Sequence, residues 1–243
     1  MRPMRPSVVA LVVGSLLVAG CTPRGCTSLK NRWKHRGAAP HAALSATSKA
    51  PPARVVVPRI DTAPTLDGKL DEPVWIERSA RSGPFRDEAT GGDAIPYSDA
   101  RFLRDDHALY VALYAADEDL RATVKAHDGP VWLDDSFDLR FSAPGASDRW
   151  VIDVSVAGVV TDVHERAPGE RDPSWESGIT LGVAIDETLN DSSDNDEEWV
   201  VESRIPLSSL PPGDDLVLAI RRCDTPKGAR RRCAVWTGTL SMK

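Results

Sequence analysis

The densest group of chemically capable side chains lies between residues 131 and 138, where a tryptophan precedes three acids. Trp132 is followed by Asp134, Asp135 and Asp138. A glycosidase requires two carboxyl groups on either side of a glycosidic bond, but the sequence places no carboxylate opposite these acids. Clustered acids on a strand and its preceding turn often occur without catalysis, so we expect no enzymatic activity. Asp134 and Asp135 could instead orient backbone groups or bind a structural cation.

Other polar residues give no clear metal site. His107, His127 and His164 are isolated in the sequence, without the spacing of a zinc site, and are expected to be exposed. The acidic segment 186–198 lacks the glycine and the bidentate glutamate of an EF-hand loop. We therefore expect a solvated loop there and no cofactor, with a structural calcium ion as the open alternative.

These side chains must be positioned by β-strands, because short alternating segments dominate from residue 55 onward. Gly and Pro turns separate the segments, and no long helical periodicity appears, so the pattern predicts an all-β, antiparallel, jelly-roll-like β-sandwich. Single helical turns are expected at 73–79 and 206–210. The predicted strands are 55–57, 108–114, 137–141, 150–156, 179–185, 199–205, 216–220 and 234–240.

The N-terminal residues indicate export and lipid attachment. Arg2 and Arg5 flank a short apolar run that ends in Leu-Val-Ala-Gly before Cys21, which resembles a bacterial lipobox. Residues 1–21 are therefore predicted to be a lipoprotein signal with its lipidation cysteine. The expected location is the bacterial cell envelope, held by the lipid alone, and the absence of aspartate after Cys21 favours the outer membrane over the inner one.

Composition divides the rest of the chain into a tether and a body. Residues 22–54 contain seven bases and no acid, among many Ala, Pro, Ser and Thr, and are predicted to be a flexible basic tether. The body, residues 55–243, has all 36 acids and 21 of the 30 bases, a formal charge of −15. A charge of that sign argues against nucleic-acid binding.

The remaining cysteines suggest one disulfide. Cys223 and Cys233 flank the turn-rich segment 224–229, and an exported chain meets an oxidising compartment. We predict a bond between them across a hairpin, with two separate thiols as the alternative. Cys26 would then be unpaired.

Several motifs, in the same order, resemble the family 9 carbohydrate-binding modules. Residues 66–75, Leu-Asp-Gly-Lys-Leu-Asp-Glu-Pro-Val-Trp, are similar to the family's opening motif, and 131–139 are similar to its tryptophan with paired acids. Residues 100–111, 199–207, 219–222 and 235–236 resemble its later strands. The resemblance covers about residues 55–240 and implies a β-sandwich that binds polysaccharide or oligosaccharide without catalysis.

The resemblance also implies a clamp in which two tryptophans hold a terminal sugar. By motif position these are Trp132 and Trp236, with Asp138 and Arg222 as hydroxyl partners and Trp175 as a rim contact. An indole packs well on the apolar face of a pyranose, and charged groups suit its hydroxyls. Trp75, Trp150 and Trp199 are expected in the core. Arg230 to Arg232 stand where the family usually offers an amide, so the glycan preference does not transfer.

Two alternatives remain at this point. Related DOMON sandwiches hold haem through methionine and histidine, but Met1, Met4 and Met242 are the only methionines and two of them lie in the signal. The other alternative is a structural or adhesion lipoprotein that has lost sugar binding. Exposure of Trp132 and Trp236 across a cleft would favour the clamp, and burial would favour the structural role.

Overall fold

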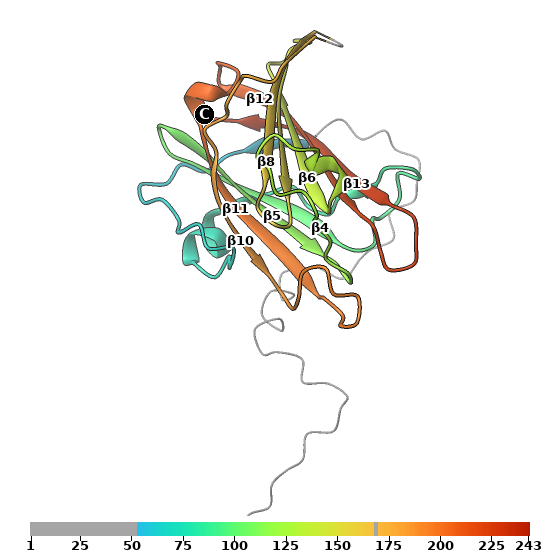
Figure 1. Cartoon of the computed structure of the whole chain (residues 1–243). Helices are drawn as coiled ribbons and strands as arrows, with labels where there is room; N and C mark the ends of the chain where they lie inside the picture. Colours follow the sequence, from blue (N-terminus) through green and yellow to red (C-terminus); the bar gives the residue numbers. More distant parts are fainter. Residues whose placement is uncertain (1–52, 168–169) are drawn as a thin grey trace, which may run out of the picture. The chain divides into compact units, whose positions relative to one another are not determined.

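In a computed structural model of the chain, residues 53–167 and 170–243 are described, and two β-sheets pack face to face within them (Figure 1). The predicted signal, Cys21, Cys26 and all but the last two residues of the predicted tether lie outside the described residues. No helix in the described part is long and apolar enough to cross a membrane.

The larger sheet has eight strands in the order β1-β13-β12-β6-β7-β8-β9, with β3 paired to β13. Its pairs are antiparallel except that β1 runs parallel to β13. Its strands are β1 (Ala53–Val56), β3 (Arg86–Asp87), β6 (Ser136–Ser142), β7 (Arg149–Ser155), β8 (Val160–Ala167), β9 (Glu170–Asp172), β12 (Asp215–Asp224) and β13 (Arg232–Ser241).

The smaller sheet has five strands in the order β10-β11-β5-β4-β2, all antiparallel. The predicted all-β sandwich is therefore confirmed. Its strands are β2 (Ala80–Arg81), β4 (Ser98–Arg104), β5 (Ala108–Ala116), β10 (Thr180–Ile185) and β11 (Glu198–Pro206).

The main core lies between the sheets and follows the predicted alternation. Leu109, Val111 and Leu113 of β5 and Phe137 and Leu139 of β6 all belong to this buried cluster. Successive side chains on a strand point to opposite faces, so the inner residues of the two sheets interdigitate. Trp199 is fully buried here, as expected.

The opposite face of β5 is also covered, by the segment that contains the opening motif. Tyr110 and Ala112 pack in a second buried cluster with Leu70 and Trp75. Trp75 is fully buried, as predicted, at the start of a single π-helical turn, η2 (Val74–Arg78). The opening motif therefore closes the outer face of the smaller sheet.

The Leu-Asp-Gly part of that motif is held in place by Glu202 of β11. Its buried carboxylate oxygen Oε2 accepts hydrogen bonds from the backbone N–H of Asp67 at 2.8 Å and of Gly68 at 2.7 Å. Gly68 has φ +77°, and a Cβ there would lie 2.3 Å from the backbone nitrogen of Ala184. Only glycine fits this close approach, so the motif has a structural role.

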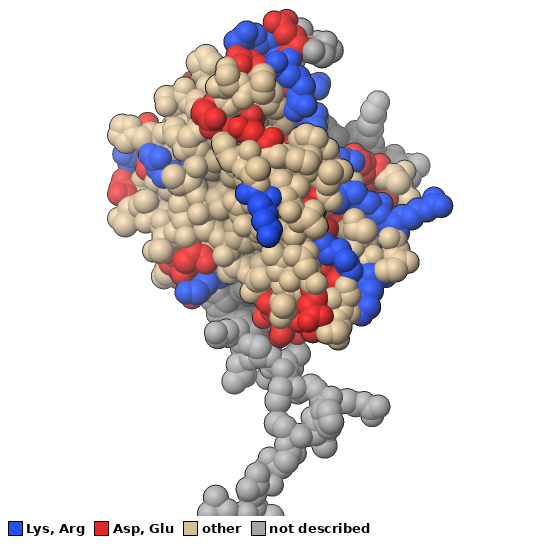
Figure 2. Space-filling model, viewed as in Figure 1, with Lys and Arg blue, Asp and Glu red and all other residues tan. Residues whose placement is uncertain are grey.

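Two short 3-10 turns complete the element order: η3 (Val131–Leu133), before β6, and η4 (Leu207–Ser209), after β11. The helical turns predicted at 73–79 and 206–210 thus correspond to η2 and η4. Figure 2 shows acidic and basic side chains mixed over the face displayed, without one continuous basic surface.

The acidic segment 186–198 forms a loop up to the start of β11 and is largely exposed, as predicted, but one acid of this loop is buried. Its carboxylate Asp196 is only 1% exposed and accepts hydrogen bonds from the backbone N–H of Leu120 at 2.6 Å and of Thr188 at 3.2 Å. Glu198 is buried as the first residue of β11. The segment therefore anchors a neighbouring loop through a buried acid.

Candidate functional site

The paired acids that precede β6 hold backbone groups, which is one of the two roles left open for them. Asp134 accepts hydrogen bonds from the backbone N–H of Thr123 and of Val124, both at 2.9 Å. Asp135 accepts from the N–H of Arg121 at 2.7 Å and of Thr225 at 3.0 Å. Both carboxylates are nearly fully buried. They order the loop 121–124 and the end of the β12–β13 hairpin.

Trp132 lies just before them, on η3, with 48% of its surface exposed. Arg231 fixes this turn: its guanidinium donates to the carbonyl oxygens of Trp132 at 2.9 Å, Leu133 at 3.3 Å and Asp134 at 2.7 Å. Three carbonyls held by one planar group leave the turn little freedom to move. The exposed indole is therefore presented from a rigid base.

A hollow of about 350 Å³ lies on the outer face of the larger sheet. Charged pairs stand on both sides: Asp138 is bound by Arg140 at 2.6 Å, and Glu88 by Arg221 at 2.9 Å. Its floor includes Ala219, Val235 and Thr237. The arrangement offers hydrogen-bonding groups around a small apolar floor.

The Trp132 turn stands at the head of this same face. Ser136, Asp138 and Arg140 alternate onto the outer side of β6, and Arg231 lies 3.5 Å from the Ser136 hydroxyl. Two residues along a strand rise about 7 Å. The turn that carries Trp132 and the charged hollow thus both adjoin the outer side of β6.

An acid beneath this surface has an altered pKa. Asp153 of β7 is the register partner of Asp138 and is only 5% exposed. Burial, together with the negative charge of Asp138, raises the pKa of Asp153 to about 7. Asp153 therefore keeps its proton to a higher pH than an ordinary aspartate does.

Trp236 is a correction to the expected clamp, because its indole is buried between the sheets. It is 7% exposed, and its ring centroid lies 5.6 Å from that of Phe102. Alternation along β13 turns its side chain inward, where a Cβ on Gly238 would lie 2.5 Å from the indole ring. The glycine makes room for the indole, so Trp236 adjoins the hollow only from below and supplies no exposed stacking face.

Arg222 is a second correction. Its side chain is fully buried, donates to Asp117 at 2.6 Å and lies 3.3 Å from Asp224. Burial of a guanidinium requires such partners, and two carboxylates with the carbonyl of Ala116 provide them. Arg222 therefore stabilises the interior and cannot reach a ligand on the surface.

The other expected residues lie apart from the hollow or support it. Trp175 is half-buried and packs on the main core from the segment between β9 and β10. A disulfide joins Cys223 to Cys233 across the β12–β13 hairpin, the pair that the sequence analysis expects to be bonded. That hairpin carries Arg231, so the disulfide braces the base of the Trp132 turn.

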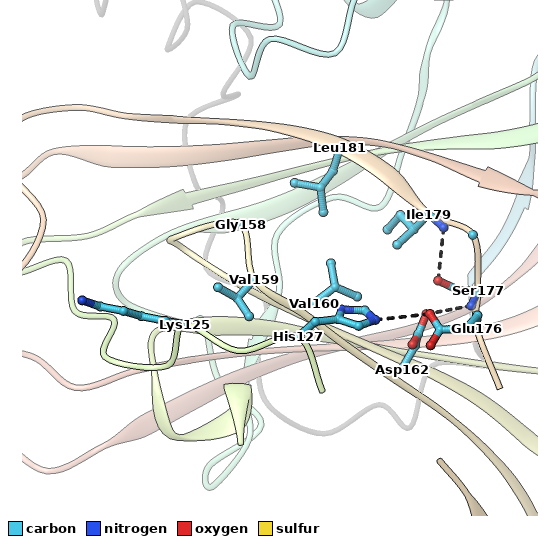
Figure 3. Close-up of a pocket in the computed structure, with 11 residues that line it drawn as sticks. Lys125, His127, Gly158, Val159, Val160, Asp162, Glu176, Ser177, Ile179 and Leu181 are labelled. Atoms are coloured by element: carbon cyan, nitrogen blue, oxygen red, sulfur yellow. Dashed lines mark hydrogen bonds and ion pairs between the residues drawn. The ribbon is translucent and has the colours of Figure 1, made fainter. Parts of the chain in front are cut away.

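A pocket of about 470 Å³ opens elsewhere, where β8 of one sheet and β10 of the other meet (Figure 3). His127, Asp162 and Glu176 line it beside the apolar side chains of Val160 and Leu181. His127 is exposed as expected but is not isolated, since its Nε2 lies 3.2 Å from a Glu176 oxygen. The hydrogen bond to Glu176 raises the pKa of His127.

Comparisons with known proteins agree on the architecture. No protein-family model matches the sequence, and no curated protein matches it. Solved structures do match. A Bacteroides uniformis protein proposed to bind carbohydrate superposes with a TM-score of 0.63 at 13% identity, over 78% of this chain and 98% of its own.

Two further structures are family 9 carbohydrate-binding modules from Caldicellulosiruptor kristjanssonii. The one in complex with cellotriose has a TM-score of 0.51 at 19% identity, over 77% of this chain and 92% of its own. The one in complex with glucose has a TM-score of 0.53 at 17% identity, over 78% and 95%. The chain has the fold of these modules. At such identities the likeness concerns the fold, and each binding residue must be argued from this chain.

Sequence reasoning missed the partners that complete the outer surface of the module-like domain. Arg231 appeared only as part of a basic run, and Glu88, Arg140 and Arg221 were not singled out. The alternation of β6 and β12 is the signal that could have found two of them, because Arg140 shares a face with Asp138, and Arg221 is two residues from Ala219 on that face. No local pattern indicates that Glu88 pairs with Arg221, 133 residues away.

Proposed function

We propose that this domain binds carbohydrate without catalysis, on the outer face of the larger sheet. The observation that carries the proposal is the exposed indole of Trp132 on a turn that Arg231 holds through three carbonyls. Exposure of a large apolar side chain to water is unfavourable, so an exposed tryptophan indicates a binding surface. Because Arg231 holds the turn in place, less conformational entropy is lost when a ligand binds. The fold neighbours that bind cellotriose and glucose support the ligand class.

The chemistry of the surface suits a sugar. Trp132 offers an apolar ring for the CH face of a pyranose, while the carboxylates and guanidinium groups of Asp138, Arg140, Glu88 and Arg221 can bind hydroxyls. Because Trp236 is buried, the stacking is one-sided rather than the two-sided clamp that the resemblance implies. One-sided stacking leaves the rest of a longer chain free to extend across the face.

The positions of Asp138 and Asp153 support binding without catalysis. Asp138 and Asp153 are register partners on adjacent strands, so their carboxyl groups lie side by side on one surface. Glycoside hydrolysis needs carboxyl groups on opposite sides of the scissile bond. In addition, Asp138 is bound by Arg140 through both oxygens.

The test is calorimetric titration of the chain without residues 1–21, first with cellotriose and glucose and then with a panel of plant, fungal and bacterial glycans. We expect Trp132→Ala to weaken binding about 5-fold to 30-fold, since stacking on an aromatic ring contributes on the order of 1 to 2 kcal/mol. Ile95→Ala removes an even more exposed apolar side chain elsewhere and should bind like the wild type. If no glycan binds to the folded wild type, the structural or adhesion role takes the place of this proposal.

We also propose that the protein is held at the cell envelope through a lipid on Cys21, with the outer membrane favoured. The lipobox-like residues before Cys21 support this location. Metabolic labelling with a fatty-acid analogue should mark the wild-type protein and not Cys21→Ser. Unlabelled wild-type protein in the soluble fraction would contradict the anchor.

A further inference from the structure

We propose that the pocket between β8 and β10 binds a divalent transition-metal cation, with Zn²⁺ as the reference ion. The ligands are His127 Nε2 and one carboxylate oxygen each from Asp128 and Glu176, and Asp162 supplies a further, buried oxygen. This site is separate from the proposed sugar surface and does not depend on it.

The first observation is the convergence of three potential ligands, one imidazole and two carboxylates. The ligand atoms of His127, Asp128 and Glu176 all lie within 4.8 Å of one another. His127 Nε2 is 3.2 Å from a Glu176 oxygen and 3.7 Å from an Asp128 oxygen. Two ligands placed about 2.1 Å from a tetrahedral ion lie roughly 3.4 Å apart. Small side-chain shifts therefore suffice to bind an ion between them.

The second observation is an unpartnered buried oxygen in the same pocket. Asp162 is only 2% exposed and lines the pocket, and its Oδ1 has no hydrogen-bond partner among the described residues. Its other oxygen accepts from the backbone N–H of Ser177 at 2.7 Å, which fixes the carboxylate in place. Asp162 and Glu176 line the same pocket, whose residues Figure 3 shows. A buried carboxylate oxygen without a partner is costly, and a cation in the pocket would satisfy it.

The segments that carry the ligands are tied together. The backbone N–H of Asp128 donates to the carbonyl of Val160 in β8 at 3.0 Å, and the N–H of Asp162 lies 3.5 Å from Asp128 Oδ1. The loop before η3, strand β8 and the segment before β10 thus meet at one point. A bound ion would link the edges of the two sheets.

The donor set indicates the class of ion. Three carboxylates give the site a formal charge of −3 when His127 is neutral, which favours a dication over a monovalent ion. An imidazole nitrogen among the ligands suits Zn²⁺ and its transition-metal neighbours, whereas Ca²⁺ and Mg²⁺ bind through oxygen alone. The one cation on the pocket wall, Lys125, is exposed and can turn outward.

An ordinary surface ion pair does not account for all of these features. His127 and Glu176 have side-chain exposures of 53% and 61%, and such pairs contribute little to stability. A pair alone would also leave Asp162 Oδ1 without a partner. The ion explains the exposed triad and the buried oxygen together.

The test is calorimetric titration of the untagged chain, residues 22–243, with ZnCl₂ after treatment with EDTA. His35 and His41 precede the described residues, so the readout is the loss of one bound ion per chain in a variant rather than the total. We expect His127→Ala to lose one Zn²⁺ per chain or to bind it at least 10-fold more weakly. His107→Ala, which removes an exposed histidine elsewhere, should retain wild-type binding.

The Asp162→Asn variant tests whether Asp162 binds the metal ion or only stabilises the fold. The amide oxygen can still accept from Ser177, so the variant should fold with an unchanged far-UV spectrum and bind Zn²⁺ at least 5-fold more weakly. The proposal is overturned if His127→Ala binds as many Zn²⁺ ions, as tightly, as His107→Ala, or if equimolar Ca²⁺ displaces the Zn²⁺. Sugar binding by His127→Ala should equal that of the wild type, so failure here leaves the proposed function standing.

Discussion

Two acidic regions of this domain have similar composition and different surroundings. At the loop end beside the β12–β13 hairpin, Asp134, Asp135 and Asp196 use both carboxylate oxygens to accept hydrogen bonds from backbone N–H groups. In the pocket between β8 and β10, Asp162 leaves one buried oxygen without a partner, next to the exposed pair His127 and Glu176.

The contrast teaches that acids in a group do not by themselves make a cation site. A carboxylate whose lone pairs already accept backbone N–H groups is part of the fold, because an ion would have to displace those bonds. A carboxylate with a free, buried oxygen has capacity left for a ligand. Asp134, Asp135 and Asp196 therefore stabilise the loop end, whereas Asp162 has an oxygen left for the proposed cation.

The largest expected effect on stability comes from removing a buried carboxylate of the loop end. Asp134→Ala leaves the N–H groups of Thr123 and Val124 without their acceptor, and we expect the free energy of unfolding to fall by about 2 to 4 kcal/mol. Glu176→Gln in the pocket should change it by less than about 0.5 kcal/mol. Urea unfolding followed by tryptophan fluorescence measures both. Equal effects of the two variants would remove the distinction between the regions.

Asp135 of the loop end should contribute to the pH dependence of stability, in addition to Asp153, whose pKa is also raised. Burial, with a contribution from the charge of Asp117, raises the pKa of Asp135 to about 7 from its ordinary value of 3.8. The folded state therefore holds a proton that the unfolded state has released, and this contribution to stability is lost as the pH rises from about 4 to about 7. We expect a loss on the order of 1 to 2 kcal/mol between pH 5 and 7.

Asp135→Asn provides the control for that prediction. The amide does not titrate, so its effect on stability should be a constant offset, and the slope between pH 5 and 7 should be shallower than in the wild type. Urea midpoints at four pH values in this window measure the difference. A steeper slope in the variant would assign the opposite sign to Asp135.

The loop end should also control the sugar surface through Arg231. Arg231→Lys keeps the charge but cannot bridge three carbonyls at once, so the Trp132 turn gains freedom. We expect binding of the best glycan to weaken about 5-fold, with a stability loss of about 1 kcal/mol. Arg230→Lys, on the exposed neighbour, is the matched control and should change neither.

The smallest effect is expected from calcium. After EDTA treatment, 1 mM CaCl₂ should shift the thermal midpoint by less than about 1 °C, because both oxygens of Asp134, Asp135 and Asp196 already accept from backbone N–H groups. Differential scanning calorimetry is sensitive enough for this comparison. A rise of several degrees would show that a structural calcium ion, the alternative left open by the sequence, binds after all.

The sequence by itself determined the strands and much of the core. Alternation assigns Leu109, Val111 and Leu113 to one buried face, because a strand buries every second side chain. Trp75 and Trp199 are assigned to the interior because each lies in a motif among other apolar residues. The resemblance also indicated the fold. The resemblance did not show that Glu202 binds the backbone of the opening motif at Gly68 and so fixes the motif to the smaller sheet.

Only the tertiary structure decided which candidates reach the surface. Trp236 and Arg222 lie on inward positions of β13 and β12, and their burial depends on Gly238 beside one and Asp117 beside the other, neither of which local sequence pairs with them. His127 and Glu176 are 49 residues apart and meet only because β8 and β10 approach at the sheet edges. Local pattern fixes which face a side chain takes, whereas long-range packing fixes what that face meets.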